Sequence, residues 1–552
     1  MQHPRPSAPV SVLSLGTRSL APLALTLASA LAIAGCSPAP SPGGGGGSGS
    51  GGRAGTGGAT GGSQGAGGRP SGGAGGSSSN SGGSPGAGGA SNPGGSGGTS
   101  NPGGSGGSSG SGGTTTRPDA GPTDMSTPGD TGGEAAPPPP AGDRETYVAT
   151  ALSPGTGQRT DRRPISVGFY DATANKTFVS WMGPGSDALV REYNHATKTW
   201  SADKVAGNAT FADKHNYPAM VRGKDNRLYV FYGCHNTPLR MAVSPNPLSI
   251  EGTWRDGNVG AAPDASYPAP IVTTDGTMYV FIRLTRAQNG HTDDRPLAYI
   301  KSTNNGQSWS RVTVLDTYPR SDNLTEIYNG KISHEPAHGN QKEKIHIAWT
   351  LAGGGPGNHE HDAYTRNVYY AYLDPSTDRL YSVTGRDLGP SIDNNEGEMY
   401  LKAVDTGCSN CAHQAGYQVS VHYNDDGTPL IVYGHEGRGL TAVRWSNNAW
   451  VSQLITTAGG EPREINKFGA RSFQVFRTTG NTCVGFRSVD GGATWSPDAV
   501  ITAPHPVQRC HVIDNHHPDV KIFMEQNPEA SGGGTSTARV TEGYLPPYKH
   551  TP

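Results

Sequence analysis

Short β-type segments, each introduced by a polar turn, recur along the second half of the chain and restrict the fold more than any other feature. The clearest are Lys176–Met182, Arg227–Tyr232, Thr277–Arg283, Lys344–Thr350 and Pro429–Tyr433. The first three begin about fifty residues apart. No segment shows a helical hydrophobic period over three turns. The pattern therefore predicts an all-β, repetitive domain.

Two sharper repeats indicate the kind of all-β domain. Ser488–Trp495 fits the Asp-box pattern Ser-x-Asp-x-Gly-x-x-Trp, and Ser302–Trp309 repeats it with Asn304 in place of Asp. In such a turn the Asx side chain caps the backbone, Gly adopts a positive φ, and Trp packs the hairpin on its neighbour. We expect residues 144–552 to form a seven-bladed β-propeller with these BNR/Asp-box repeats.

The N-terminal region indicates export. Arg5 and Arg18 precede the apolar run Leu20–Ile33, which is too short for a bilayer span and is followed by Ala34-Gly35-Cys36. Residues 1–36 thus resemble a lipoprotein signal peptide with lipobox Cys36, although an ordinary signal with an incidental Cys stays open. We expect a protein of the outer membrane or cell surface, anchored by lipid alone, or one released from the cell.

Residues 37–143 consist of Gly/Ser/Pro-rich runs with almost no large apolar side chain. Such a segment cannot bury enough surface to offset its chain entropy, so we expect a disordered tether. The chain has a formal net charge of −2 and no basic block, which gives no support to nucleic-acid binding.

Cysteine usage raises the question of a metal. With Cys36 assigned to the lipid, an odd number of cysteines remains, so they cannot all pair. Cys408, Cys411 and His413 form the densest cluster of soft ligands and fit part of a structural zinc site. A local disulfide or free thiols are the alternatives. Candidates for the fourth ligand are His334, His359, His361 and His422.

Two His-Asn pairs lie at turns next to successive β segments. His215-Asn216 precedes one segment and His235-Asn236 follows it. Tyr267 stands in Ser-Tyr-Pro-Ala, parallel to Asn216-Tyr217-Pro218-Ala219, and Arg283 ends a later segment. Because propeller sites form where loops of several blades converge, we expect these side chains to meet. His346 is a further, weaker member.

These motifs resemble the BNR-repeat ulvan lyases of polysaccharide lyase families 24 and 25, over roughly residues 145–545. The resemblance implies a seven-bladed propeller that cleaves an acidic, sulfated polysaccharide by β-elimination, leaving a 4,5-unsaturated uronate. It implies His215 and Tyr267 as the acid/base pair and His235 and Arg283 as uronate-binding residues. From the motifs themselves we also expect Asn216 and His346 to bind substrate. The resemblance also implies a structural zinc, with no cofactor for catalysis.

The residue types suit this chemistry independently. A guanidinium can neutralise the uronate carboxylate, and His and Tyr can take and give protons. We expect a monomer acting on an acidic polysaccharide. Two alternatives stay open, a non-catalytic glycan-binding surface propeller and a sialidase-like glycosidase. For the sialidase-like glycosidase, an Arg-Ile-Pro motif would be expected near residue 165, and this chain has none there.

Overall fold

The computed structural model describes only part of the chain, in the following ranges: 146–148, 150–151, 157–158, 163–288, 291–317, 326–353, 365–406, 419–435, 439–458, 462–503, 506–526 and 535–540. All of these residues belong to the compact unit Pro122–Pro552, which is separate from Met1–Gly121. The predicted signal peptide with Cys36 and the predicted tether 37–143 lie outside the described residues.

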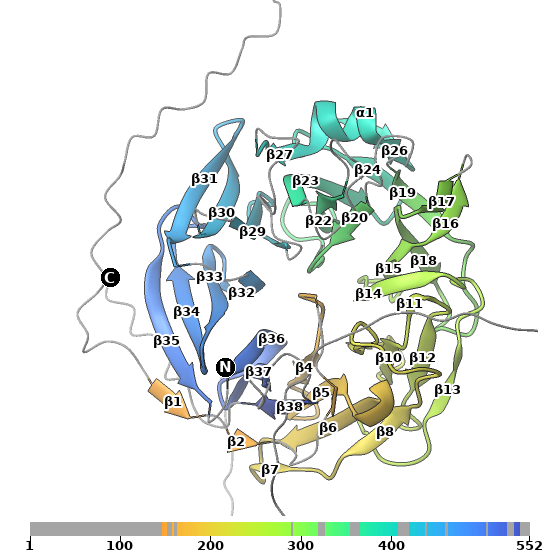
Figure 1. Ribbon diagram of the computed structural model, residues 1–552. Coiled ribbons are helices and arrows are strands. Elements are labelled where there is room, and N and C mark those ends of the chain that lie inside the picture. The colour runs from red at the N-terminus through yellow and green to blue at the C-terminus, as the bar shows by residue number, and fades with distance from the viewer. Residues whose placement is uncertain are drawn as a thin grey trace, which may run out of the picture. The chain divides into compact units, whose positions relative to one another are not determined.

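The described residues are almost entirely β-strand, as predicted. Their helices are short: η2 (Pro184–Ser186), α1 (Asn394–Glu396) and η4 (Gly397–Leu401). Within these residues no helix has the length and apolar character needed to cross a bilayer. The strands form sheets that follow one another around a common axis in a propeller-like arrangement (Figure 1).

The largest sheet joins the two ends of the described chain. Its strands, in order, are β2 (Thr150–Ala151), β38 (Thr535–Val540), β37 (Val520–Gln526), β36 (Val507–His517), β4 (Gly168–Asp171), β5 (Lys176–Met182), β6 (Ala188–Asn194) and β7 (Thr199–Trp200), with β3 (Gly157–Gln158) beside β38 and β8 (Lys204–Gly207) beside β6. A single parallel register pair, Asp514 with Phe169, connects β36 to β4. We call this junction the seam.

The next sheets along the chain carry the predicted site residues. One consists of β13 (Arg255–Asn258), β12 (Arg240–Val243), β10 (Leu228–Tyr232) and β9 (Ala219–Arg222). The other consists of β11 (His235–Thr237), β14 (Ala265–Val272), β15 (Met278–Leu284), β18 (Leu297–Ser302), β19 (Thr313–Thr317) and β26 (Ile392–Asp393). A separate hairpin pairs β16 (Arg286–Gln288) with β17 (His291–Asp294).

Three further sheets complete the arrangement. The first contains β20 (Glu326–Asn329), β21 (Ser333–Glu335), β22 (Lys344–Ala352), β23 (Thr365–Asp374), β24 (Arg379–Tyr381), β25 (Asp387–Gly389) and β27 (Lys402–Val404). The second contains β28 (Ser420–Tyr423), β29 (Pro429–His435), β30 (Gly439–Ser446) and β31 (Ala449–Thr456). The third contains β1 (Thr146–Val148), β35 (Ser496–Thr502), β34 (Thr482–Ser488), β33 (Ser472–Thr479) and β32 (Pro462–Gly469).

The hydrogen-bonded sheets do not divide into seven equal blades. They range from two to ten strands, because the seam fuses β36 and β4 into one sheet and extra short strands extend others. The sheets therefore confirm an all-β, propeller-like fold, but they do not by themselves give the predicted number of blades.

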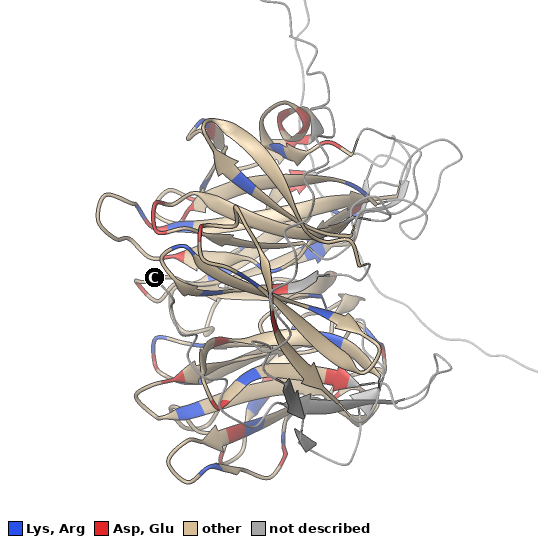
Figure 2. Cartoon of the chain, turned by 90° about the vertical axis from the view of Figure 1, so that its left-hand side faces the viewer, with Lys and Arg blue, Asp and Glu red and all other residues tan. Residues whose placement is uncertain are grey.

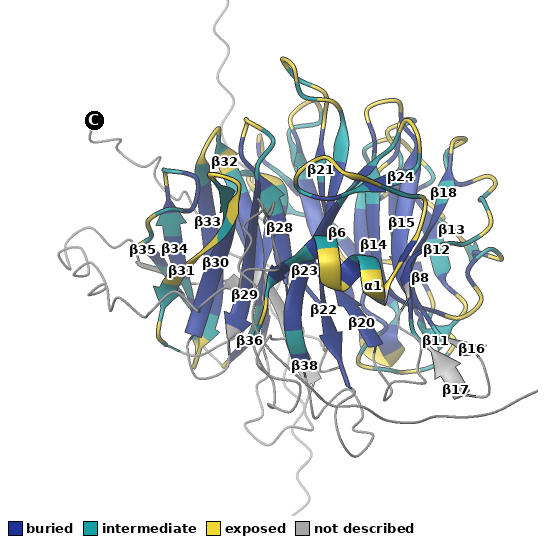
Figure 3. Cartoon of the chain, turned by 90° about the horizontal axis from the view of Figure 1, so that it is seen from above, coloured by how far each residue is buried: buried dark blue, intermediate teal, exposed yellow. Residues whose placement is uncertain are grey.

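The core lies between neighbouring sheets. Every residue of β15 is buried, which is expected of a strand covered on both faces. By contrast, β31 lies at an outer edge and is mostly exposed. Figure 3 shows the same trend, with buried residues along the strands and exposed residues concentrated in the connecting loops. In Figure 2, Lys and Arg are interspersed with Asp and Glu, in keeping with the nearly neutral net charge.

Both Asp-box turns form as predicted. Asp490 accepts hydrogen bonds from the Ser488 hydroxyl at 2.8 Å and from the backbone N–H of Thr494 at 2.9 Å. Asn304 accepts the equivalent bonds from Ser302 and from the N–H of Ser308. The motif glycine Gly492 has φ 87°, a conformation that favours glycine.

Candidate active site

Asp213 brings the two predicted histidines together. Its Oδ1 lies 2.7 Å from Nδ1 of His215, and its Oδ2 lies 3.0 Å from Nδ1 of His235. The same carboxylate accepts the backbone N–H of His215 at 2.8 Å. The two imidazole centroids are 4.0 Å apart. The turn before β9 and the end of the β10–β11 connection therefore form one cluster.

The charge of Asp213 determines how the imidazoles are oriented. Burial raises the pKa of Asp213, but hydrogen bonds from His215 and His235 outweigh burial and hold the pKa well below its usual value. An ionised carboxylate only accepts hydrogen bonds, so Nδ1 of each histidine carries the proton. Each Nε2 is then left with a lone pair that can accept a proton.

Tyr267 lies against both histidines in a strained backbone conformation. Its ring centroid is 5.9 Å from those of His215 and His235. Its φ is 58°, which is unusual for a bulky residue, and the β14–β15 pairing shifts register between Ser266 and Ala269. Such a bulge redirects a side chain, and backbone strain of this kind concentrates at functional sites.

Two guanidinium groups lie over the Tyr267 ring. The Cζ of Arg283 is 4.7 Å from the ring centroid, and that of Arg163 is 5.0 Å away. Arg283 is fully buried at the end of β15, where its Nη1 donates to Glu326 Oε2 at 2.9 Å. This cluster of positive charge suits an anionic group of a ligand.

The two phenols near these cations differ in their bonding. Tyr328 donates its hydroxyl to Glu326 Oε2 at 3.0 Å, and burial raises its pKa well above the usual value. It therefore stays a neutral phenol committed to a carboxylate. Tyr267, which faces the histidines, is better placed for proton transfer.

The two asparagines of the His-Asn pairs have different surroundings. Asn216 is buried and its Nδ2 donates to the Phe211 carbonyl at 2.9 Å, which stabilises the turn that carries His215. Asn236 instead accepts from Arg283 Nη2 at 3.1 Å and from Thr285 at 2.6 Å, so it orients the guanidinium.

The structure does not bring His346 into this cluster. Its ring is fully buried, with Nε2 bonded to Glu335 at 2.8 Å and Nδ1 bonded to Tyr370 at 2.7 Å. It also stacks on Tyr423. Because both ring nitrogens are used inside the core, the expected substrate-binding role of His346 is corrected to a structural one.

The predicted zinc ligands Cys408, Cys411 and His413 lie outside the described residues, as do His359 and His361. The two other candidates are described. His334 pairs with Glu343 at 2.6 Å, and His422 accepts the backbone N–H of Tyr423 at 3.0 Å.

Several site residues were not predicted from the sequence. Asp213 lies two residues before His215, and a carboxylate at that position could have suggested its role. Arg163, Tyr328 and Glu326 had no comparable signal, because they come from distant segments. They meet only when the strand ends converge.

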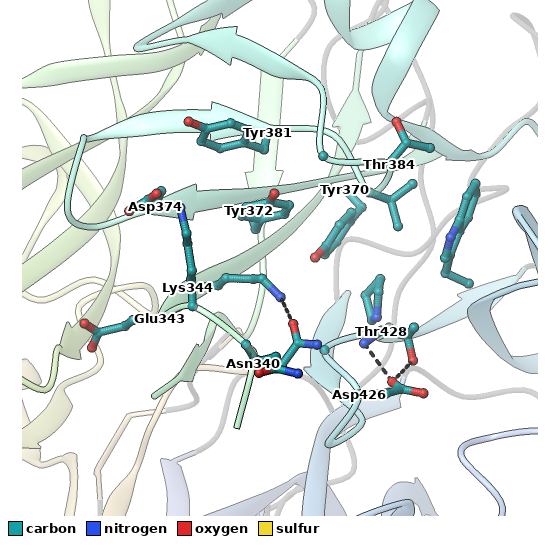
Figure 4. Close-up of a pocket in the computed structure, with 17 residues that line it drawn as sticks. Asn340, Glu343, Lys344, Tyr370, Tyr372, Asp374, Tyr381, Thr384, Asp426 and Thr428 are labelled. Carbon is teal, nitrogen blue, oxygen red and sulfur yellow. Dashed lines mark hydrogen bonds between the residues drawn. The ribbon is translucent and has the colours of Figure 1, made fainter. Parts of the chain in front are cut away.

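Two hollows lie elsewhere on the sheets. One, of about 800 Å³, is lined by residues of β4, β9, β14, β21, β28, β32 and β36. The other, of about 570 Å³, lies between the sheets of β22–β25 and β28–β31, and Figure 4 shows Tyr370, Tyr372 and Tyr381 among its lining side chains. Neither is lined by His215, His235 or Tyr267.

Comparison with known proteins identifies the family. Residues 176–458 match the BNR repeat-containing family. The chain belongs to that family. The match begins at β5, ends in the loop after β31, and includes His215, His235, Tyr267 and Arg283.

Relatives with known names are similar over about two thirds of this chain. An ulvan lyase from Alteromonas sp. (strain LOR) is 24% identical over 410 residues, covering 66% of this chain and 82% of the relative. The solved structure of a polysaccharide lyase PL25 ulvan lyase superimposes with a TM-score of 0.57 at 19% identity, covering 72% and 95% of the two chains. A second structure of that kind, bound to -[GlcA(1-4)Rha3S]-, has a TM-score of 0.56, with the same identity and coverage. These structures support the propeller-like fold of this BNR repeat-containing protein.

Proposed function

We propose that the protein is a polysaccharide lyase that cleaves a uronate-containing, sulfated, ulvan-like polysaccharide by β-elimination. One observation carries the proposal: His215, His235 and Tyr267 meet beside the guanidinium of Arg283, and a single carboxylate orients both imidazoles. The similar ulvan lyases support the same activity.

The elimination needs two kinds of group. A cation must neutralise the uronate carboxylate, because negative charge develops there when the neighbouring C–H proton leaves. Arg283 and Arg163 supply that charge. A proton acceptor must take the proton, and a donor must protonate the departing glycosidic oxygen. His215 and Tyr267 fill these roles, and which one takes the proton depends on the uronate epimer.

Hydrolysis suits the cluster less well. A glycosidase of the usual kind needs two carboxyl groups flanking the scissile bond. Among the described residues, the carboxylates bonded to this cluster are Asp213 and Glu326. Asp213 accepts from both histidines, and Glu326 pairs with Arg283 and Arg295. Cys234 is not a candidate nucleophile, because burial raises the pKa of its thiol.

The substrate class follows from the relatives and the charge of the site. The similar lyase structure is bound to a repeat of GlcA and sulfated rhamnose. We infer that this protein accepts the same kind of acidic repeat, whose carboxylate would lie by the guanidinium groups. Purified protein given ulvan, without added cofactor, should produce the ultraviolet absorbance of an unsaturated uronate. New reducing ends without that absorbance would indicate hydrolysis, and binding without any product would indicate a glycan-binding propeller.

We also propose a seven-bladed propeller. One observation supports the count. The 800 Å³ hollow is lined by residues of seven strands, which are β4, β9, β14, β21, β28, β32 and β36. A crystal structure with another number of blades would reject the proposal.

We propose that the protein is exported and attached to the outer membrane or cell surface by a lipid on Cys36. The disulfide between Cys483 in β34 and Cys510 in β36 supports export, because structural disulfides persist mainly in oxidising compartments. Labelling with radioactive palmitate tests the anchor, and an unlabelled mature protein would contradict it.

We further propose that Cys408, Cys411 and His413 bind a structural zinc that takes no part in catalysis, and that the protein is a monomer. The support for this site is the type of its ligands, since two thiols and an imidazole are groups that commonly bind zinc. Metal analysis should show that Cys408→Ser holds one equivalent of zinc less than the wild type, with activity retained, and sedimentation should give the mass of one chain.

A further inference from the structure

Three side chains with metal-ligating atoms meet at the seam. His195 follows β6, His517 ends β36, and Asp519 lies in the β36–β37 turn. The strands β4 and β36 are parallel, and β6 is antiparallel to β5, so these positions all lie at the end of the sheets where β4 ends. His215 and Tyr267 lie at the opposite end, where β9 and β14 begin.

The spacing of the three side chains suits one cation. Each offers a ligand atom within 4.8 Å of the other two. Asp519 Oδ2 is 3.7 Å from Nδ1 of His195 and 3.7 Å from Nδ1 of His517. Ligands bound tetrahedrally to zinc at 2.0–2.2 Å lie about 3.4 Å apart, so the two distances to Asp519 exceed this spacing by a few tenths of an ångström.

The buried imidazole of His195 has a ring nitrogen without a hydrogen-bond partner among the described residues, which is independent evidence for a ligand at this cluster. It is only 6% exposed, and its Nε2 lies 2.8 Å from the Thr177 hydroxyl oxygen. Donation from Nε2–H to that oxygen leaves a lone pair on Nδ1, which has no hydrogen-bond partner among the described residues. A metal-bound histidine commonly has this arrangement, with one nitrogen on the metal and the other held by a hydrogen bond.

The surroundings hold the ligands in place. Tyr170 and Tyr193 lie edge-on to the His195 ring, with centroids 5.1 and 4.9 Å away. The Nδ1 of His517 accepts the backbone N–H of Asp519 at 3.1 Å. This bond keeps imidazole and carboxylate on the same side of the turn, and a metal on Nδ1 would replace it. His517 and Asp519 are partly exposed, which gives a cation access.

We propose that His195, His517 and Asp519 bind a divalent transition metal, with zinc the best match, and that this ion stabilises the seam between the first and last groups of strands. Two histidines and one carboxylate are a common zinc ligand set, and water would take the fourth position. In the described residues, the backbone pairing of β4 with β36 consists of one register pair, Asp514 with Phe169. The hydrogen bond from Ser166 to Asp514 at 2.7 Å and an apolar cluster that includes Val167 and Ile513 add to this junction. A metal would add a cross-link between segments at the two ends of the sequence.

The experiment uses the full chain and separates this site from the predicted cysteine site. Zinc content is measured by mass spectrometry after dialysis for the Cys408→Ser/Cys411→Ser protein and for the same protein with His517→Asn. The first should keep about one equivalent of zinc and the second much less. His338→Asn in the same background is the matched control, because His338 is outside the cluster, and it should bind zinc like its parent. Equal zinc in all three proteins would overturn the proposal.

A second measurement does not use the His517→Asn variant, so it does not depend on how well that variant folds. Zinc sulfate at a hundredfold excess over Kd should raise the unfolding temperature of the Cys408→Ser/Cys411→Ser protein by roughly 3–6 °C. Cobalt(II) in that protein should give visible d–d bands without thiolate charge transfer, as expected for N and O ligands. No thermal shift and no cobalt bands would overturn the proposal, whereas lyase activity should be the same with and without metal at 25 °C. A failure of the lyase proposal can therefore be distinguished from a failure of the metal-site proposal.

Discussion

The phenolic hydroxyl of Tyr267 is the group that we expect to transfer a proton. Tyr267→Phe removes the hydroxyl and keeps the ring beside Arg283, so it should lower kcat by about 10²- to 10⁴-fold without unfolding the protein. Steady-state kinetics on ulvan provides the measurement. Tyr328→Phe is the matched control, since the Tyr328 hydroxyl is bonded to Glu326 and should matter much less. Equal losses in both variants would remove Tyr267 from proton transfer.

Asp213 should act as a positioning residue, because its two carboxylate oxygens are bonded to the two histidines. Asp213→Asn should reduce kcat at least tenfold, since an amide can donate to Nδ1 and favour the wrong tautomer. KM should change less, because Arg283 remains. Unchanged kcat in a folded Asp213→Asn protein would show that the carboxylate does not orient the imidazoles.

The depressed pKa of Asp213 also predicts a pH effect on stability. A carboxyl group whose pKa is lower in the folded state stabilises the fold above its unfolded pKa, near 3.8, and loses this contribution as the pH falls below it. The stability difference between wild type and Asp213→Asn should shrink as the pH falls below about 3.8. Urea unfolding at several pH values tests this, and a difference that grows in acid would contradict it.

At the scale of residues, sequence reasoning found the groups with recognisable chemistry. His215, His235, Tyr267 and Arg283 do meet, because each lies where a strand begins or ends at the same edge. His346 failed for a physical reason. Alternation along a strand predicts two possible faces, and only the packing of Glu335 and Tyr370 decides that this ring is a core hydrogen-bonding group.

Among the elements, a buried ion network links three strands or their connections. Lys331, in the link between β20 and β21, donates to Glu464 of β32 at 3.1 Å and also pairs with Asp514 of β36. Lys331→Met would leave Glu464, which is fully buried, without the ammonium group and bonded to His511, and should cost about 3–5 kcal/mol. Lys467→Met is the control. Its ammonium pairs with the exposed Asp425, so about 0–1 kcal/mol is expected. Similar losses of unfolding free energy for Lys331→Met and Lys467→Met, measured in urea, would show that burial of the ion pair does not determine the cost of removing it.

The two Asp-box turns offer a comparison of a charged and a neutral cap. Asp490→Ala removes hydrogen bonds to a carboxylate and should cost about 1.5–3 kcal/mol. Asn304→Ala removes bonds to a neutral amide oxygen and should cost about 0.5–1.5 kcal/mol. Both turns were predictable from eight residues, because their hydrogen bonds are local. Denaturant midpoints provide the test, and a larger loss for Asn304→Ala would contradict it.

For the whole molecule, the sequence predicted the class of fold but not its closure. The β-type segments and Asp-boxes are local patterns, so the all-β architecture follows from them. The seam between β36 and β4, the Cys483–Cys510 disulfide and the His195–His517–Asp519 cluster join residues far apart in sequence. No local pattern indicates such pairs, and a single sequence contains no other signal for them.

The chemical nature of the product formed from ulvan decides whether the function proposed for the whole molecule is correct. Incubation of the purified protein with ulvan, followed by ultraviolet absorbance and by mass spectrometry of the oligosaccharides, tests it most directly. We predict an unsaturated uronate at the new non-reducing end, formed without added cofactor and lost in Tyr267→Phe. Saturated oligosaccharides carrying an added water, or no cleavage by wild-type protein that still binds ulvan, would contradict the proposed β-elimination.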